Sequence, residues 1–195
     1  MKMSKLEKKF VNSKKHAQGN IRVVEEIFDK VELGDVSDAL EVGCGAGVLA
    51  MHLSEKHHVR VAGTDVDSDQ IYLANVHAED DGNLQFCVAD ATCLPFSKNA
   101  FHMVLSFKVM HHIGRWQVAF GEIQRVLKPK GFFILNDIAC SPLITNMLRS
   151  MVKKYGVYSF EEVIDSCQRV GLKLIYQEGP RGFIFEPFTI VVQNN

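Results

Sequence analysis

Three glycines at alternate positions, Gly43, Gly45 and Gly47, follow a short apolar run that carries Glu41. Glycine has no Cβ, so the chain can turn sharply there and a ligand can approach the backbone N–H groups. An amphipathic helical pattern begins at Val48, and the N-terminus of such a helix favours a negatively charged or polar ligand group. The spacing predicts a strand, a tight loop and a helix, which together open a nucleotide-binding α/β fold.

The spacing of the glycines differs from that of a dinucleotide-binding loop. A G-x-G-x-x-G loop needs its third glycine at position 48, where this chain has Val48, and the extra glycine is Gly47. A nicotinamide oxidoreductase is disfavoured for this reason, and no Tyr-x-x-x-Lys pair is present. The pattern E-x-G-x-G-x-G is similar to motif I of the class I S-adenosylmethionine-dependent methyltransferases. The alternative is a structural turn without a ligand.

Two further acids end predicted strands. Asp65 lies 22 residues after Gly43, close to the spacing of about 20 for an acid that binds ribose hydroxyls, and a carboxylate can accept from both hydroxyls. The alternative is that Asp65 caps a helix starting near Ser68, although Asp67 or Ser68 can cap it instead. In the family, an acid at the place of Asp90 accepts from the adenine amino group.

The resemblance extends over residues 37–138 and includes an acid followed by L-P-F, an apolar strand followed by H-H-I, and E-I-x-R-V-L-K-P-x-G. This set resembles the small-molecule methyltransferases typified by quinone-biosynthesis enzymes (methyltransferase type 11). It implies S-adenosyl-L-methionine as cofactor and S-adenosyl-L-homocysteine as product. The family usually has Asp at His102 and Gly at Lys130, neither of which it needs to hold the cofactor. The implied cofactor-binding residues are Glu41, Gly43, Cys44, Gly45, Gly47, Asp65, Val66, Asp90, Ala91, Ser106 and Phe107.

His111 is the candidate catalytic residue, because histidine can accept a proton near neutral pH. The alternative is that the His-His pair only orients its loop. His112, Lys108 and Asp137 are weaker candidates, and Asp137 either lines the substrate site or caps a turn. No metal site is expected: the cysteines form no C-x-x-C pair, and their odd number indicates reduced thiols in a cytoplasmic protein. They are Cys44, Cys87, Cys93, Cys140 and Cys167.

The composition limits the partners. The formal net charge is −1, so no global attraction to nucleic acid or to an anionic membrane is expected. No apolar run is long enough for a membrane span, and the first residues show no apolar region of a signal peptide. Residues 1–16 carry six lysines and one glutamate, which favours a solvated helix face over an RNA-binding arm. Neither an Asn-Pro-Pro-Tyr turn nor a Pro-Cys dipeptide is present, so base methylation is disfavoured.

The whole chain is expected to form one domain. Residues 1–35 form an N-terminal helical cover, 37–138 the cofactor-binding core, and 139–195 the substrate-side helices and final two strands. We expect a Rossmann-like doubly wound α/β fold with helices on both faces. Its seven strands follow the family's order 3-2-1-4-5-7-6, with strand 7 antiparallel. Helices are predicted at residues 21–31 and 116–128, strand five at 132–137, and a capping box at Ser159–Glu162.

The sequence thus predicts transfer of a methyl group to a small-molecule acceptor by in-line displacement. Apolar residues near the substrate side favour an apolar or aromatic acceptor, unless they belong to the core: Ile144, Met147, Met151, Phe183 and Phe185. The alternative function is a non-catalytic S-adenosylmethionine-binding protein with a regulatory or partner-binding role, which would keep the same cofactor residues.

Overall fold

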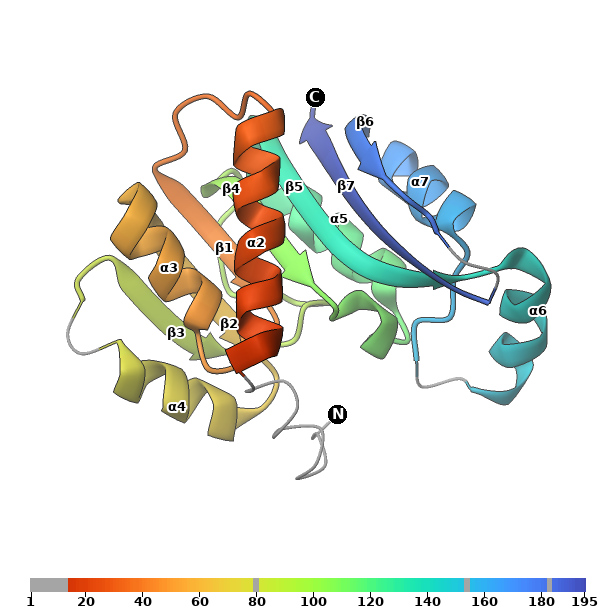
Figure 1. Ribbon diagram of the computed structural model, residues 1–195, viewed down its shortest axis with the longest axis horizontal. Helices are drawn as coiled ribbons and strands as arrows, with labels where there is room; N and C mark the ends of the chain where they lie inside the picture. Colours follow the sequence, from red (N-terminus) through yellow and green to blue (C-terminus); the bar gives the residue numbers. More distant parts are fainter. Residues whose placement is uncertain (1–13, 79–80, 153–154, 182–183) are drawn as a thin grey trace. The chain divides into compact units, whose positions relative to one another are not determined.

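The computed structural model describes residues 14–78, 81–152, 155–181 and 184–195. Its strands form a seven-stranded sheet in the order β3-β2-β1-β4-β5-β7-β6, and β7 is antiparallel to both β5 and β6 (Figure 1). This confirms the predicted fold class and strand order. The chain divides into two compact units, residues 1–91 and 92–195, which are described in turn. Within the described part, no helix is both long and apolar enough to cross a membrane.

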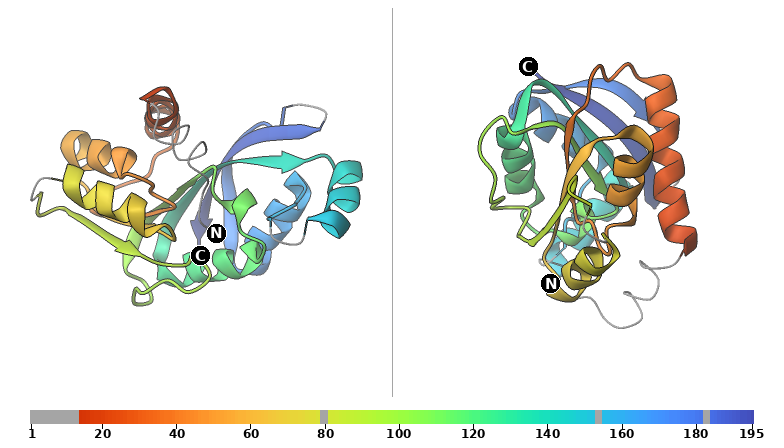
Figure 2. Two further views of the ribbon diagram at one scale, coloured as in Figure 1. Left: turned by 90° about the horizontal axis from the view of Figure 1, so that it is seen from below. Right: turned by 90° about the vertical axis from the view of Figure 1, so that its left-hand side faces the viewer.

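The first unit contains three parallel strands and three described helices. The strands β1 and β2 are largely buried, as is typical of interior strands of an α/β sheet. The helices α3 and α4 lie side by side against β2 and β3 (Figure 2). The helix α2 packs on α3 and begins at Lys14, earlier than predicted. The elements are α2 (Lys14–Lys30), β1 (Asp38–Val42), α3 (Val48–His57), β2 (Arg60–Asp65), α4 (Ser68–His77) and β3 (Leu84–Val88).

The second unit is an α/β unit with a parallel pair, β4 and β5, and antiparallel pairs of β7 with β5 and β6. The helix α5 packs on β5 and contacts α7, which lies against β6. The elements are β4 (Phe101–Phe107), the 3-10 helix η1 (Met110–His112), α5 (Trp116–Val126), β5 (Leu127–Cys140), α6 (Pro142–Met151), α7 (Phe160–Arg169), β6 (Leu172–Glu178) and β7 (Phe185–Asn194).

The strand β5 differs from its prediction. It begins at Leu127, with no separate turn at residues 129–131, and its pairing with β4 shifts register between Phe101 and Met103. Lys130 has a φ of 62°, the left-handed conformation that glycine adopts without a Cβ penalty. The register shift absorbs the Pro-Lys-Gly sequence inside the strand. This explains why the family's usual residue at position 130 is glycine.

The capping box of α7 is confirmed. Ser159 Oγ accepts from the backbone N–H of Glu162, and the Glu162 side chain accepts from the backbone N–H of Ser159. Gly171, just beyond the helix, has a φ of 86°, as expected for a C′ residue. The helical pattern expected around Leu6, Phe10 and Val11 lies outside the described residues.

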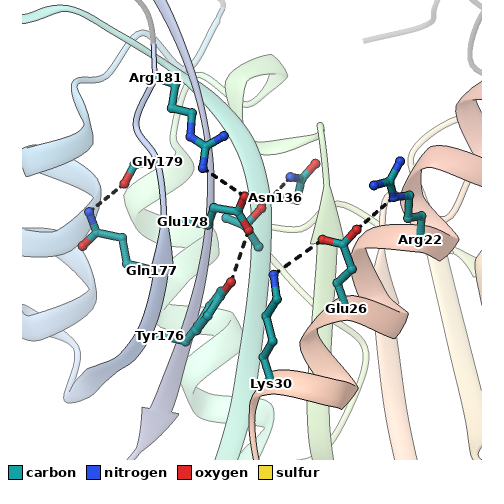
Figure 3. A network of polar contacts seen from close by, with 10 residues as sticks. Arg22, Glu26, Lys30, Asn136, Tyr176, Gln177, Glu178, Gly179 and Arg181 are labelled. Atoms are coloured by element: carbon teal, nitrogen blue, oxygen red, sulfur yellow. Dashed lines mark hydrogen bonds and ion pairs between the residues drawn. The ribbon is translucent and has the colours of Figure 1, made fainter.

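Both units carry ion pairs between residues three or four positions apart. On α2, Glu26 accepts from Arg22 and also pairs with Lys30, which lies four residues later (Figure 3). At the end of β6, Glu178 accepts from Tyr176 and Arg181. These exposed pairs contribute little to stability individually, so packing of the apolar strands and helices holds each unit.

Candidate cofactor and active site

The glycine loop connects β1 to α3 through three left-handed residues. The φ angles are 76° at Gly43, 52° at Gly45 and 78° at Gly47. The backbone N–H groups of Gly43 and Cys44 both donate to the Thr64 carbonyl on β2, at 2.7 and 2.9 Å. Gly47 is the N-cap of α3 and supplies no side-chain cap. No side chain of the N-cap residue therefore covers the N-terminus of α3, where backbone N–H groups can bind a ligand.

Packing gives Gly47 a second reason to be glycine. A Cβ at Gly47 would lie 2.7 Å from Cζ of Phe86, and a Cβ at Gly63 would lie 2.5 Å from Cδ1 of the same ring. The β3 side chain of Phe86 thus fills the space over two glycines. This contact was not predicted from the sequence, because Phe86 is not part of the loop motif.

Asp65 anchors the glycine loop from the end of β2. Its Oδ2 accepts from the Gly45 N–H at 3.0 Å, and its Oδ1 accepts from the Asp67 N–H at 2.9 Å. The carboxyl is buried, and burial raises its pKa while these hydrogen bonds oppose the shift. A carboxylate has about four acceptor sites, so the group can still accept from a ligand beside its backbone hydrogen bonds, which include one from Val66. Asp67, not Asp65, caps α4 by accepting from the Asp69 N–H, so the capping alternative for Asp65 is wrong.

Glu41 is a buried acid with one unused oxygen. A hydrogen bond from the Ala50 backbone ties its carboxyl to the first turns of α3, whereas Oε2 has no hydrogen-bond partner. Burial raises the pKa of Glu41 to about 8. The Ala50 hydrogen bond opposes this rise, and the nearby charge of Asp65 contributes to it. A neutral carboxyl at pH 7 can lose its proton when a cationic group approaches.

Cys44 points its thiol at the Gly45 carbonyl, with Sγ 3.6 Å from the oxygen. Burial raises the pKa of this thiol, and the charges of Glu41 and Asp65 raise it further. The thiolate needed for nucleophilic attack is therefore suppressed, which agrees with a packing role for the side chain. Val66, the next predicted residue, is half exposed after β2.

Asp90 is exposed after β3, and Ala91 beside it is buried. In the second unit, the loop that follows is held by two α5 side chains. Glu122 accepts from the Leu94 N–H at 2.8 Å, and Arg125 donates to the carbonyls of Leu94 and Phe96 at 3.0 and 2.7 Å. Arg125 also pairs with Glu122 at 2.7 Å. The E-I-x-R segment contained this clamp, but the sequence analysis assigned it no role.

Ser106 and Phe107, at the end of β4, are buried. Ser106 Oγ has no hydrogen-bond partner, which leaves a polar group available in an apolar strand end. Lys108 follows with a φ of 58° and donates its N–H to the Asn136 carbonyl at 2.7 Å. The chain turns there into η1, which carries the histidine pair.

His111 is paired with Asp137. Its Nδ1 lies 2.5 Å from Oδ1 of Asp137, whose side chain is completely buried, while the His111 side chain is 28 % exposed. Asp137 Oδ2 also accepts from the Met110 N–H at 2.8 Å. Both oxygens of the Asp137 carboxyl therefore contact the loop that follows β4. His112 is exposed, and its ring is tilted by 42° against the His111 ring, with the ring centroids 4.0 Å apart.

Tyr158 completes this cluster from the segment before α7. Its hydroxyl faces Asp137, and its pKa is raised well above the usual value, first by burial and then by that charge. The backbone beside it is tightly packed: a Cβ at Gly156 would lie 2.5 Å from the Met110 carbonyl oxygen. Gly156 also donates its N–H to the His111 carbonyl at 2.9 Å. No sequence motif indicated either residue.

The structure thus brings the predicted residues together in two groups, each within one unit. The first contains Glu41, the glycine loop and Asp65, linked by hydrogen bonds and by burial. The second contains Ser106, Phe107 and His111, on β4 and the turn that follows it. Each group offers buried polar atoms at the carboxyl end of a strand, the usual ligand side of such sheets.

Residues 40–135 match the family model described as "Methyltransferase domain". The chain belongs to the class I S-adenosylmethionine-dependent methyltransferases. The chain is 25% identical over 146 residues to the Methyltransferase GfsG of Streptomyces halstedii, covering 73% of this chain and 52% of that protein. It is 36% identical over 136 residues to the mitochondrial Arginine-hydroxylase NDUFAF5 of Danio rerio, covering 66% of this chain and 41% of that protein. The chain therefore spans about half or less of the length of these relatives.

Among solved structures, the chain resembles in fold the geranyl diphosphate C-methyltransferase of Streptomyces coelicolor A3(2), which was solved with S-adenosyl-L-homocysteine. The TM-score is 0.76 at 15% identity, covering 89% of this chain and 76% of that one. S-adenosyl-L-methionine is the cofactor of this family. The residues present fit it: a glycine loop without Cβ atoms, spare lone pairs on Asp65, and a buried acid oxygen of Glu41 without a partner.

Proposed function

We propose that this methyltransferase transfers the methyl group of S-adenosyl-L-methionine to a small-molecule acceptor by in-line displacement, and that His111 removes a proton from the acceptor. The observation that carries the proposal is the pair of His111 with Asp137. A completely buried carboxylate 2.5 Å from Nδ1 keeps the proton on that nitrogen. Nε2 then keeps its lone pair and can act as a general base.

The cofactor-binding roles belong to the same proposal. The backbone of Gly43, Cys44, Gly45 and Gly47 approaches the cofactor, and Asp65 accepts from its ribose hydroxyls. Glu41 faces its cationic part, Asp90 accepts from the adenine amino group, and the remaining predicted residues line the site. These are Val66, Ala91, Ser106 and Phe107. Support comes from the spare acceptors of Asp65 and Glu41.

The bound cofactor supplies an already activated methyl group. The chain has to align the acceptor and exclude water. It also has to remove a proton if the nucleophile begins as a hydroxyl or a carbon acid. Asp137 orients the His111 ring and stabilises the imidazolium that forms after proton transfer. The base assignment favours such a protonated acceptor.

A small acceptor is supported by the short connection between β5 and β6, which holds only α6 and α7 among the described residues. Of the apolar residues expected at the substrate side, Met147 and Phe185 are exposed, which favours an apolar or aromatic acceptor. Phe183 lies outside the described residues. Free thiols at all five cysteines favour a reducing compartment, and we propose the cytoplasm.

The test measures S-adenosyl-L-homocysteine formation with a panel of small hydroxyl-bearing and aromatic acceptors, on wild type, His111→Gln and His112→Gln. We expect at least a 100-fold loss of kcat, about 2.7 kcal/mol, for His111→Gln. His112→Gln, which replaces the neighbouring exposed histidine, should keep kcat within tenfold of the wild-type value. If the kcat of His111→Gln also stays within tenfold of the wild-type value, His111 only orients the loop.

The alternative function makes a different prediction in the same experiment. A non-catalytic binding protein would bind S-adenosyl-L-homocysteine in calorimetric titration but would turn over no acceptor. The relative named an arginine-hydroxylase makes this control worthwhile, since a similar sequence there bears the name of another activity.

A further inference from the structure

Three side chains capable of binding a metal converge between two helices of the first unit. Glu25 lies on α2, and His52 and His57 lie on α3. The Nε2 atoms of both histidines are 2.7 Å from the same oxygen, Oε1 of Glu25. The three ligand atoms all lie within 4.8 Å of one another. These residues take no part in the cofactor or catalytic roles proposed above.

We propose that Glu25, His52 and His57 form a binding site for a divalent transition metal ion of the Zn²⁺ type, which joins α2 to α3. Two imidazole nitrogens and one carboxylate oxygen form a ligand set that Zn²⁺ uses, with water in the fourth tetrahedral position. The side chains of Glu25 and both histidines are 23–24 % exposed, so solvent can deliver the ion and supply that water.

The surroundings hold the ligands ready. Hydrogen bonds from His52, Lys56 and His57 hold the Glu25 carboxyl group in place. The Lys56 ammonium binds Oε2 and leaves Oε1 to the histidines. The Phe28 ring meets the His57 ring edge-on at 4.6 Å, which restricts its rotation. Such supporting contacts orient metal ligands.

Only small movements convert the cluster into a coordination site. Metal–ligand distances of about 2.0–2.2 Å place tetrahedral ligand atoms about 3.3 Å apart, so the 2.7 Å contacts widen by roughly 0.6 Å. Each histidine must then carry its remaining proton on Nδ1, because Nε2 binds the ion. Rotation of the three side chains is the movement proposed for this change.

The site is separate from the glycine loop. His57 is the last residue of α3, ten residues after Gly47, which corresponds to roughly 15 Å along the helix. Metal binding therefore fastens α2 to the opposite end of the helix from the loop. The cysteine spacing predicted no metal site, and Glu25 lies 27 residues before His52, so these ligands form no short sequence motif.

Calorimetric titration of untagged, chelator-treated protein with Zn²⁺ tests the proposal. We expect one ion per chain, and binding at least about tenfold weaker in Glu25→Gln, His52→Gln and His57→Gln. His58→Asn is the matched control: His58 is exposed beside the cluster, and asparagine tolerates its φ of 54°. It should bind as wild type does.

Zn²⁺ binding that survives the Glu25→Gln and His57→Gln substitutions, or that His58→Asn abolishes, overturns the proposal. So does the absence of a bound ion in the wild type. Each variant is first checked by circular dichroism. Because a ligand variant could unfold, hydrogen exchange of the wild type with and without Zn²⁺ gives an independent result. Amides of α2 and α3 should exchange more slowly with the ion, and unchanged exchange contradicts the joining of the helices.

Discussion

His111 Nδ1 lies 2.5 Å from Oδ1 of Asp137, and the same carboxylate accepts from the backbone N–H groups of Met110 and Ile138. One buried acid thus fixes both the loop and the ring. Because the acid lies on β5 and the histidine follows β4, the pairing depends on the parallel register of these two strands.

Asp137→Asn tests this relationship. An asparagine amide can turn its NH₂ towards Nδ1, which then must accept and leaves the proton on Nε2, where it blocks the base. We expect kcat to fall at least 100-fold, about 2.7 kcal/mol, while S-adenosyl-L-homocysteine affinity stays unchanged. Asp165→Asn, an exposed acid on α7, is the control. If Asp137→Asn lowers stability but the folded fraction keeps a normal kcat, the role of Asp137 is purely structural.

Asp65→Ala should weaken both cofactor binding and folding. The substitution removes the acceptor for the N–H groups of Gly45 and Asp67, and in the proposed role it also leaves ribose hydroxyls unpaired. Calorimetry with S-adenosyl-L-homocysteine should show a loss of about 1–3 kcal/mol, and denaturant unfolding should show a loss as well. Exposed Asp69→Ala on α4 serves as the control. Wild-type affinity in Asp65→Ala would contradict the assignment.

Gly47→Ala should destabilise the protein by about 2–4 kcal/mol, combining left-handed strain with overpacking. The reason is a φ of 78° and a Cβ that would lie 2.7 Å from Phe86 Cζ. Phe86→Leu should relieve the contact, so a double-mutant cycle in urea should be non-additive by about 1 kcal/mol. Gly121→Ala, in α5 with open space around it, should instead stabilise. Additive Gly47 and Phe86 effects would rule out the contact.

The stability of Glu41→Gln relative to wild type should depend on pH. Because the pKa of Glu41 is raised from 4.5 to about 8, the folded wild type keeps a proton that the unfolded chain has lost. Its unfolding free energy should therefore fall by about 1.4 kcal/mol per pH unit between 4.5 and 8, a slope that Glu41→Gln lacks. Urea unfolding of both proteins across this range measures it. Parallel curves would mean that Glu41 is already ionised.

Lys130→Gly should stabilise the protein. Lysine at a φ of 62° bears the left-handed penalty of about 1–2 kcal/mol, and the greater freedom of glycine in the unfolded chain offsets part of the gain. Thermal unfolding should show a net increase of up to about 1 kcal/mol. The control is Lys173→Gly, on the exposed strand β6, where the same replacement should destabilise. A loss at both positions would indicate that Lys130 bears no such strain.

Prediction from the sequence succeeded where the signal is local. The glycine spacing identified the loop and its strand and helix, and Ser159 and Glu162 identified a capping box that forms as expected. The strand order came from the family resemblance, and the structure confirms it. For the loop and the capping box, neighbouring residues determine the conformation, so a short stretch of sequence contains the information.

Prediction failed where a contact joins distant residues. Phe86 reaches over Gly47 and Gly63 from another strand, and Tyr158 faces Asp137 from the segment before α7. Neither has a spacing that a motif can express. The start of β5 was misplaced because Pro129 and Gly131 usually mark a turn, whereas here a register shift accommodates them within the strand.

The loop clamped by Glu122 and Arg125 gives the protein a natural position for a reporter dye. Cys93 is exposed in this loop, three residues after Asp90. Cys44 and Cys167 are buried, and burial raises their thiol pKa values. A maleimide fluorophore at neutral pH should therefore react with Cys93 first, without engineered cysteines. Because the arginine holds the loop by its carbonyls, the dye sits on an ordered support, and its emission can follow cofactor titrations in real time.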